Sequence, residues 1–179
     1  MGEYINTVVE TRGPSGWRES EATVFSNDPT WPGHDSSEFT RHAFFWQSCT
    51  MYTLFADVRV REHGIVPLAP DRGLPDDASD EALQKLTGGW GGHDWLQIGE
   101  YNTVAKKIEN RYHDTSFGFS WLSAAELLAV DYDVLITSVD DRTKIESLRE
   151  ALGDLYFKHL GQLAQLGNPN DVRILFCFS

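Results

Sequence analysis

The chain has 179 residues, of which 41% are hydrophobic and 12% aromatic, which suits one folded domain with an apolar core and excludes a wholly disordered chain. Its formal net charge is −12, and a surface this acidic repels phosphate backbones and anionic lipids. We therefore expect no binding to nucleic acid or membranes. The two cysteines have no CxxC spacing, and no basic segment precedes an apolar run, so we expect a single cytoplasmic domain over residues 1–179.

The first part of the chain predicts three strands and a long loop. Residues 4–11 are rich in β-branched side chains, residues 13–16 favour a turn, and residues 17–25 return, which together indicate a β-hairpin. The stretch 26–38 is rich in turn residues and predicts a loop. The aromatic stretch 41–46 predicts a third, well-buried strand.

Helices follow this strand. Apolar residues share one face over 51–59, which predicts a helix with Ser48 or Thr50 as its N-cap. Residues 79–86 predict a brief helix whose first turn is acidic. Apolar residues spaced at three and four predict another helix over 98–111.

The last third has the clearest pattern. Ser123 and Glu126 have the spacing of a capping box at the start of a helix, and residues 134–139 predict a short strand. A long amphipathic helix is expected over 143–166, broken near Gly153 and ended by Gly167 in the C-cap position. The run 172–178 has almost no polar interruption.

The run 172–178 therefore predicts a strand in the centre of a sheet. We expect an α+β fold with a mostly antiparallel sheet, made from the N-terminal hairpin, the third strand and the C-terminal strand. The helices are expected to cover one face of this sheet.

Candidate ligand contacts concentrate between residues 57 and 127, where arginine, histidine, tryptophan and glycine occur without helical or strand periodicity. Arg72 lies in a turn restricted by Pro70 and Pro75, and its planar fork of donors suits a phosphate or carboxylate. The alternative is that Arg72 pairs with Asp76 or Asp77 to hold the loop.

Other residues of this stretch suit the same ligand. Arg59 could meet an anion, although an arginine at a helix end is more often solvated or part of a structural ion pair. Trp90 and Trp95 could stack on a purine, and His93 and His113 could contact the ligand. No spacing typical of a zinc site occurs, so we expect no metal and no cofactor.

Several segments resemble a family of small proteins from phages, prophages and actinobacteria that open with Met-Gly-Cys-Asp-Ile-His. Its other marks are an Ala-Asp-Val-Arg helix, a Pro-Arg-Gly-Leu-Pro loop, a Trp-Gly…Gly-His segment, a Ser-Trp-Leu-Thr helix start and an Asp-Val-Arg-Ile-Val-Phe-Trp-Phe ending. The corresponding segments keep this order here and lie at residues 52–59, 72–77, 90–93, 120–128 and 167–176.

Two departures from the family pattern bear on function. Tyr4 and Asn6 stand where the family has aspartate and histidine, which favours binding over catalysis and makes both residues candidate ligand contacts. Residues 94–118 resemble an insertion, which we interpret as a lid or an interface segment. The resemblance itself implies no particular activity.

The leading hypothesis is a binding protein that is not an enzyme. By analogy with phage proteins, it would sequester a nucleotide-derived host immune signal, such as a cyclic nucleotide or a cyclic ADP-ribose species, in the host cytoplasm. A homo-oligomer would suit this role, since subunit boundaries enclose ligands well. Two alternatives stay open: a phosphodiesterase or other hydrolase that uses His93 or His113 with Arg72, and an acidic inhibitor that binds another protein.

Overall fold

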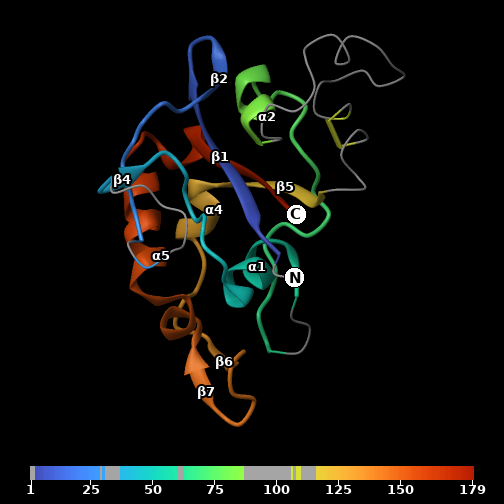
Figure 1. The fold of residues 1–179 in the computed structure, drawn as a ribbon, viewed down its shortest axis with the longest axis vertical. Coiled ribbons are helices and arrows are strands. Elements are labelled where there is room, and N and C mark those ends of the chain that lie inside the picture. Colours follow the sequence, from blue (N-terminus) through green and yellow to red (C-terminus); the bar gives the residue numbers. More distant parts are fainter. Residues whose placement is uncertain are drawn as a thin grey trace.

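A four-stranded antiparallel sheet with the strand order β2-β1-β8-β5 forms the centre of the computed structural model (Figure 1). Its strands are β1 (Ile5–Gly13), β2 (Gly16–Glu19), β5 (Phe117–Ser123) and β8 (Val172–Phe178). The structure describes residues 3–28, 30, 37–59, 63–86, 106, 108–109 and 116–179. The fold is α+β, and the predicted antiparallel sheet is confirmed.

Strand β8 is the central element, as its apolar sequence predicts. All seven of its residues are buried, and it pairs with β1 from Ile5↔Phe178 to Thr11↔Val172. Strand β5 pairs along its other side. The N-terminal hairpin is also confirmed, although β2 is shorter than predicted and pairs only with the second half of β1.

The prediction of a third strand over residues 41–46 is wrong. This segment is an irregular turn that lies beside β1, where the Thr7 hydroxyl donates to the carbonyl of Ala43 at 2.5 Å. Phe44 has a positive φ of 54° and is fully buried, so its aromatic side chain enters the core without a strand backbone.

Strand β5 takes the place of that expected strand in the sheet. Its pairing with β8 is interrupted between Phe117 and Ser120. Because of this irregularity, the sequence of β5 does not show the regular alternation of apolar and polar residues that marks a strand. Gly118 lies within this irregularity with φ 62°, and a Cβ at this position would approach the Phe178 ring to 2.8 Å. A glycine is therefore required here by both backbone conformation and packing.

Two helices begin at the predicted N-cap residues Ser48 and Ser123. Helix α1 (Cys49–Ala56) is capped by Ser48 and ends at Asp57, which adopts a left-handed conformation, so it stops before the predicted end at Arg59. Helix α4 (Ala124–Leu128) has the predicted capping box of Ser123 and Glu126.

Helix α5 (Leu148–Ala164) starts later than predicted, because residues 145–147 form a strand. The predicted break is confirmed at Gly153, whose φ of 78° and ψ of 173° are not helical. Its C-cap is Gln165 and not Gly167. The turn before β8 is a 3-10 helix over Pro169–Asp171.

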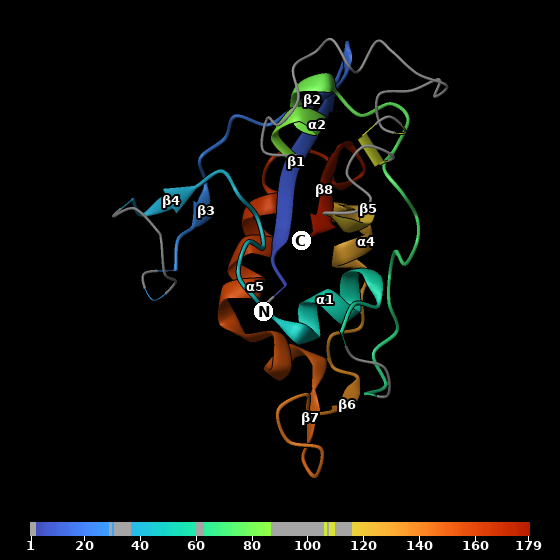
Figure 2. The ribbon, with the colours of Figure 1, turned by 45° about the vertical axis from the view of Figure 1, so that its right-hand side comes forward.

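Helices lie on both faces of the main sheet, so the expectation of a single covered face is wrong. Helices α1, α4 and α5 pack against the face that carries Val9, Ile174 and Phe176. Helix α2 (Asp80–Leu86) packs with Val8 and Leu175 on the other face, and Figure 2 shows it near the end of the sheet where β2 lies.

Two small sheets complete the described fold. Strand β3 (Phe25–Ser26) pairs with β4 (Phe39–Thr40), and β6 (Leu135–Thr137), which confirms the strand predicted over 134–139, pairs with β7 (Ile145–Ser147). The β6–β7 hairpin projects from the body (Figure 1). No helix in the described parts of the chain has the length and apolar character needed to cross a bilayer.

One buried histidine joins α5 to the irregular segment that replaced the expected strand. His159 is fully buried, and its Nδ1 accepts a hydrogen bond from the Phe44 N–H at 3.0 Å. Its Nε2 lies 2.8 Å from the carbonyl of Ser26 and therefore carries the proton. Burial lowers the pKa of His159 to about 4, so the ring is neutral at pH 7.

This histidine predicts a loss of stability in mild acid. Its pKa falls from 6.5 to about 4 on folding, so below pH 6.5 the unfolded chain binds a proton that the folded chain does not. The free energy of unfolding should fall as the pH drops from 6.5 to 4, by about 3 kcal/mol in total from this one group.

Urea unfolding of the natural protein and of His159→Gln at pH 7 and pH 5 would measure this effect. The variant should be less sensitive to pH in this range, because its side chain does not titrate. Equal pH sensitivity in the two proteins would contradict the prediction. If the variant does not fold, an NMR titration that finds the His159 ring protonating near pH 6.5 would contradict it equally.

Candidate functional site

Arginine and tryptophan side chains alternate across the α2 face of the main sheet. The Arg173 guanidinium carbon lies 3.8 Å from the ring centroid of Trp17 and 5.6 Å from that of Trp121. Arg12 continues the row at 5.1 Å from Trp17, and Arg72 continues it at 4.7 Å from Trp121. We call these five residues the Arg–Trp ladder. Such cation–π contacts stabilise both partners, most strongly when they are shielded from water.

At the centre of the ladder is a buried ion pair. Arg173 Nε donates to Glu10 Oε2 at 2.7 Å, and the two side chains are 3% and 0% exposed. Arg173 Nη1 donates to Asp77 at 2.9 Å, while the second oxygen of Glu10 accepts the Ser79 N–H at 2.7 Å. Sequence reasoning missed this pair because β1 and β8 place together two residues that are 163 positions apart.

Arg72 is engaged within the protein, as its alternative interpretation predicts, although with a different partner. Its guanidinium makes a bidentate pair with Glu126 at 2.7 and 3.0 Å and also donates to the carbonyls of Trp121 and Leu68. Burial alone would raise the pKa of Glu126, but hydrogen bonds from Arg72 and Ser123 hold it below its usual value. The expected pairing with Asp76 or Asp77 is therefore replaced by a pairing with α4.

The turn that carries Arg72 is held on its other side as well. Asp71 and Gly73 have positive φ values of 54° and 76°, and the Leu74 N–H donates to the Glu109 carboxylate at 2.6 Å. A Cβ at Gly73 would lie 3.1 Å from that carboxylate. The turn is therefore held to Glu109 through the Leu74 amide and to Glu126 of α4 through the Arg72 side chain.

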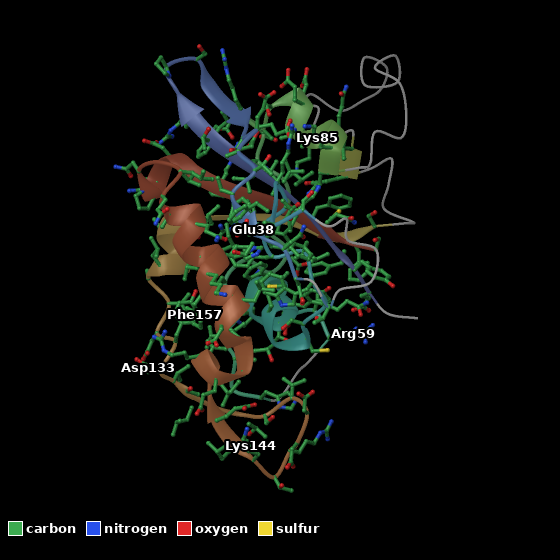
Figure 3. The ribbon with its side chains drawn as sticks, turned by 60° about the vertical axis from the view of Figure 1, so that its left-hand side comes forward. Glu38, Arg59, Lys85, Asp133, Lys144 and Phe157 are labelled. Atoms are coloured by element: carbon green, nitrogen blue, oxygen red, sulfur yellow. The ribbon has the colours of Figure 1, made fainter. Side chains whose placement is uncertain are left out.

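Three other predicted contacts lie where the first strand meets α1 and the C-terminus. Arg59 Nε pairs with the Glu3 carboxylate at 2.5 Å, and Figure 3 shows Arg59 in this part of the protein. Asn6 donates to the Ser179 hydroxyl at 3.2 Å, while the side chain of Tyr4 is 54% exposed. The structure therefore brings Tyr4, Asn6 and Arg59 to one end of the sheet, away from Arg72.

The remaining predicted contacts lie outside the described residues. They are Trp90, His93, Trp95 and His113, together with the 94–118 segment except for 106, 108–109 and 116–118. Their assignment to the ligand stays a prediction from the sequence.

A cavity of about 220 Å³ lies at the outer edge of β1, at the point where β2 stops pairing with it. We call it the edge notch. Its lining residues are Thr7, Val8, Val9, Glu19, Ser20, Arg41, His42 and Lys85. Sequence reasoning missed the notch because its walls come from β1, the end of β2, α2 and the segment wrongly predicted as a strand.

Two backbone amides of β1 face the notch. In an antiparallel strand the N–H and C=O of one residue point to the same side. The Val9 carbonyl accepts the Ser20 N–H at 2.8 Å, and the Thr7 carbonyl lies 3.5 Å from His42 Nδ1, so both residues face the outer edge. Neither amide N–H has an acceptor among the described residues, which leaves two donors for a ligand.

The side chains around the notch carry a local excess of positive charge. Lys85 pairs with Glu19, whereas Arg41 is exposed and has no ion-pair partner in the described part of the chain. If His42 Nδ1 donates to the Thr7 carbonyl, its unprotonated Nε2 stays available as a hydrogen-bond acceptor. The chain as a whole has a net charge of −12, but at the notch the charges of Arg41 and Lys85 exceed that of Glu19. An anion at the notch is therefore attracted by the nearest charged side chains.

No family model, curated protein or solved structure matches this chain.

Two side chains of reactive types, Cys177 and His159, are buried and unavailable to a ligand. Burial raises the pKa of the Cys177 thiol to about 12, so it stays protonated and unreactive at pH 7. His159 is buried with both ring nitrogens engaged. Within the described ranges, no group of three histidine, cysteine, aspartate or glutamate side chains could hold a metal ion.

The structural role of Arg72 can be tested directly. Arg72→Ala removes the bidentate pair with Glu126 and the contact with Trp121, and should lower the free energy of unfolding by about 2 kcal/mol. Arg18→Ala is the matched control, because Arg18 is an exposed arginine on β2, and should change stability by less than about 0.5 kcal/mol. Urea unfolding measures both. Equal effects of the two substitutions would show that Arg72 is not part of a structural joint.

Proposed function

We propose that the protein binds a small anionic ligand and that the edge notch holds the charged group of this ligand. The observation that carries the proposal is the convergence of Arg41 and Lys85 with the amides of Thr7 and Val9 on one small cavity. Oxygen atoms of a phosphate or carboxylate accept hydrogen bonds from the guanidinium, the ammonium and both amides. The strand edge fixes the two amides in place, so they need no reorganisation on binding.

The size of the notch limits what it can enclose. At about 220 Å³ it is smaller than a typical pocket for a whole small molecule, and it suits one phosphoryl or carboxyl group. The rest of the ligand would extend over the surrounding surface. Arg41 supplies a planar fork for two oxygens, and Lys85 supplies a second positive charge beside Glu19.

The ligand class that we propose is nucleotide-derived, and the role is sequestration of a cyclic nucleotide or cyclic ADP-ribose signal. This class rests on the tryptophans and the family resemblance seen in the sequence, and the notch supports it by offering a phosphate site. The sequence predicts Arg59 and Arg72 as the residues that bind the anion, but their side chains pair with Glu3 and Glu126. We therefore propose Arg41 as the arginine that binds the anionic group of the ligand.

A hydrolase acting on the same ligands is the second candidate, because His42 brings a titratable ring to the notch. With Nδ1 donating to the Thr7 carbonyl, the unprotonated Nε2 could act as a general base that takes a proton from a water attacking a bound phosphodiester. The two candidates differ in outcome, since a binding protein returns the ligand unchanged and a hydrolase returns a product.

Titration with inorganic phosphate, followed by two-dimensional NMR, tests the site itself. The amide signals of Thr7 and Val9 should shift progressively, and the shifts should be absent when sodium chloride replaces phosphate at equal ionic strength. In Arg41→Ala the apparent affinity should fall about tenfold or more, because a charged hydrogen-bond donor is lost. Arg18→Ala should behave like the natural protein.

Calorimetry with 3′,5′-cyclic AMP and with cyclic ADP-ribose tests the ligand class. Each nucleotide is then released from the protein by heat and analysed by chromatography. Recovery of unchanged nucleotide supports binding, and recovery of an opened nucleotide supports hydrolysis. Phosphate shifts confined to residues outside the notch, or an Arg41→Ala variant with unchanged affinity, would overturn the proposed site.

A further inference from the structure

The β6–β7 hairpin projects from the body of the protein (Figures 1 and 2), and it carries exposed apolar side chains. Leu135 is 69% exposed and Ile145 is 61% exposed. In the register of this hairpin Ile145 lies opposite Thr137, and Leu135 lies opposite Ser147, so Leu135 and Ile145 share one face. Exposed aliphatic residues gathered on one face of a strand pair are typical of a contact surface.

One edge of this hairpin is covered and the other is open. The outer edge of β6 is covered by His63, whose carbonyl accepts the Thr137 N–H at 3.1 Å and whose Nδ1 lies 3.0 Å from the Thr137 carbonyl. On β7, Glu146 is paired with Ile136, and the Lys144 carbonyl accepts the Ser138 N–H, so the backbone groups of these two β7-side residues are directed toward β6. Ile145 therefore directs its N–H and C=O outward.

The open edge is limited to a single residue. The N–H of Thr143 donates to the Asp141 carboxylate at 2.9 Å, and the N–H of Ser147 donates to the Glu150 carboxylate at 2.9 Å. Both flanking outward amides are thus occupied by side chains of the same chain. Only Ile145 offers a free donor and acceptor along β7 among the described residues.

We propose that β7 pairs with β7 of a second copy of this chain, antiparallel, about a twofold axis at Ile145. Each Ile145 donates its N–H to the carbonyl of the other, and the two side chains meet across the axis. A twofold contact uses the same patch on both subunits, so one open residue at its centre is sufficient.

The charges on either side of Ile145 select this register. With Ile145 opposite Ile145 of the partner subunit, Lys144 lies opposite Glu146 of the partner subunit, twice over. A shift of two residues one way places Lys144 opposite Lys144 of the partner subunit, and a shift the other way opposes the two Glu146 side chains. Only the central register pairs opposite charges, and it sets them at a closely spaced, non-hydrogen-bonded position.

The contact is small, which fixes how it should behave. Two hydrogen bonds, two isoleucines and two charge pairs bury less than the roughly 1,200 Å² of stable interfaces. The dimer should therefore form reversibly as the protein concentration rises, and should not persist at high dilution. It extends the small sheet of β6 and β7 across the axis without involving the edge notch.

Sedimentation equilibrium on the full chain tests the proposal with variants in which the charge of Lys144 or Glu146 is reversed. The natural protein should approach twice the chain mass as its concentration rises. Lys144→Glu and Glu146→Lys each place like charges opposite each other and should stay at the mass of one chain. An equimolar mixture of the two variants should associate again, since each glutamate then meets a lysine.

The mixture is the decisive sample, because Lys144 and Glu146 also pair within one chain at 3.0 Å. Each variant loses that internal pair, and mixing cannot restore it. Ile145→Asp is a further variant at an exposed position and should abolish association without unfolding the protein. A natural protein that stays monomeric at the highest attainable concentration, variants that associate alone, or a mixture that does not associate would each overturn the proposal.

Discussion

The buried pair of Glu10 and Arg173 is the interaction on which the rest of the structure depends. It joins β1 to the central strand β8. The two carboxylate partners of Arg173, Glu10 and Asp77, also connect that strand to the segment before α2, where the Ser79 N–H donates to Glu10. A buried ion pair adds little net stability compared with apolar residues of the same shape, but removing one partner leaves an uncompensated charge in the interior. The pair therefore acts mainly by specifying one arrangement of the sheet and α2.

The Arg–Trp ladder extends this constraint across the sheet. Trp17 and Trp121 lie against Arg173, and Arg72 continues from Trp121 to Glu126 on α4. Arginines that suggest an anion site in the sequence are in this way used to hold strands and helices together. The donors left for a ligand lie elsewhere, at the edge of β1 where β2 ends and where Arg41 and two amides remain without partners in the described residues.

The sequence predicts those parts of the fold that depend on local patterns. The capping boxes of Ser123 and Ser147, the break at Gly153 and the apolar strand β8 depend on local sequence, and all but the Ser147 box were anticipated. The prediction of a strand at 41–46 was wrong because Phe44 reaches the core from a left-handed backbone conformation, which composition does not reveal. Strand β5 was missed because its pairing is irregular beside Gly118. The partners of Arg72 and Arg173 could not be foreseen, since both pairs join residues more than 50 positions apart.

A double-mutant cycle on Glu10 and Arg173 tests the central claim most directly. Urea unfolding would compare Glu10→Gln, Arg173→Met and the double variant with the natural protein. Each single substitution should cost about 3–5 kcal/mol, and the double variant should cost less than their sum by at least about 2 kcal/mol, because neither charge is then left alone. Costs that add to within about 0.5 kcal/mol would contradict the account, since they would show that the two side chains contribute independently.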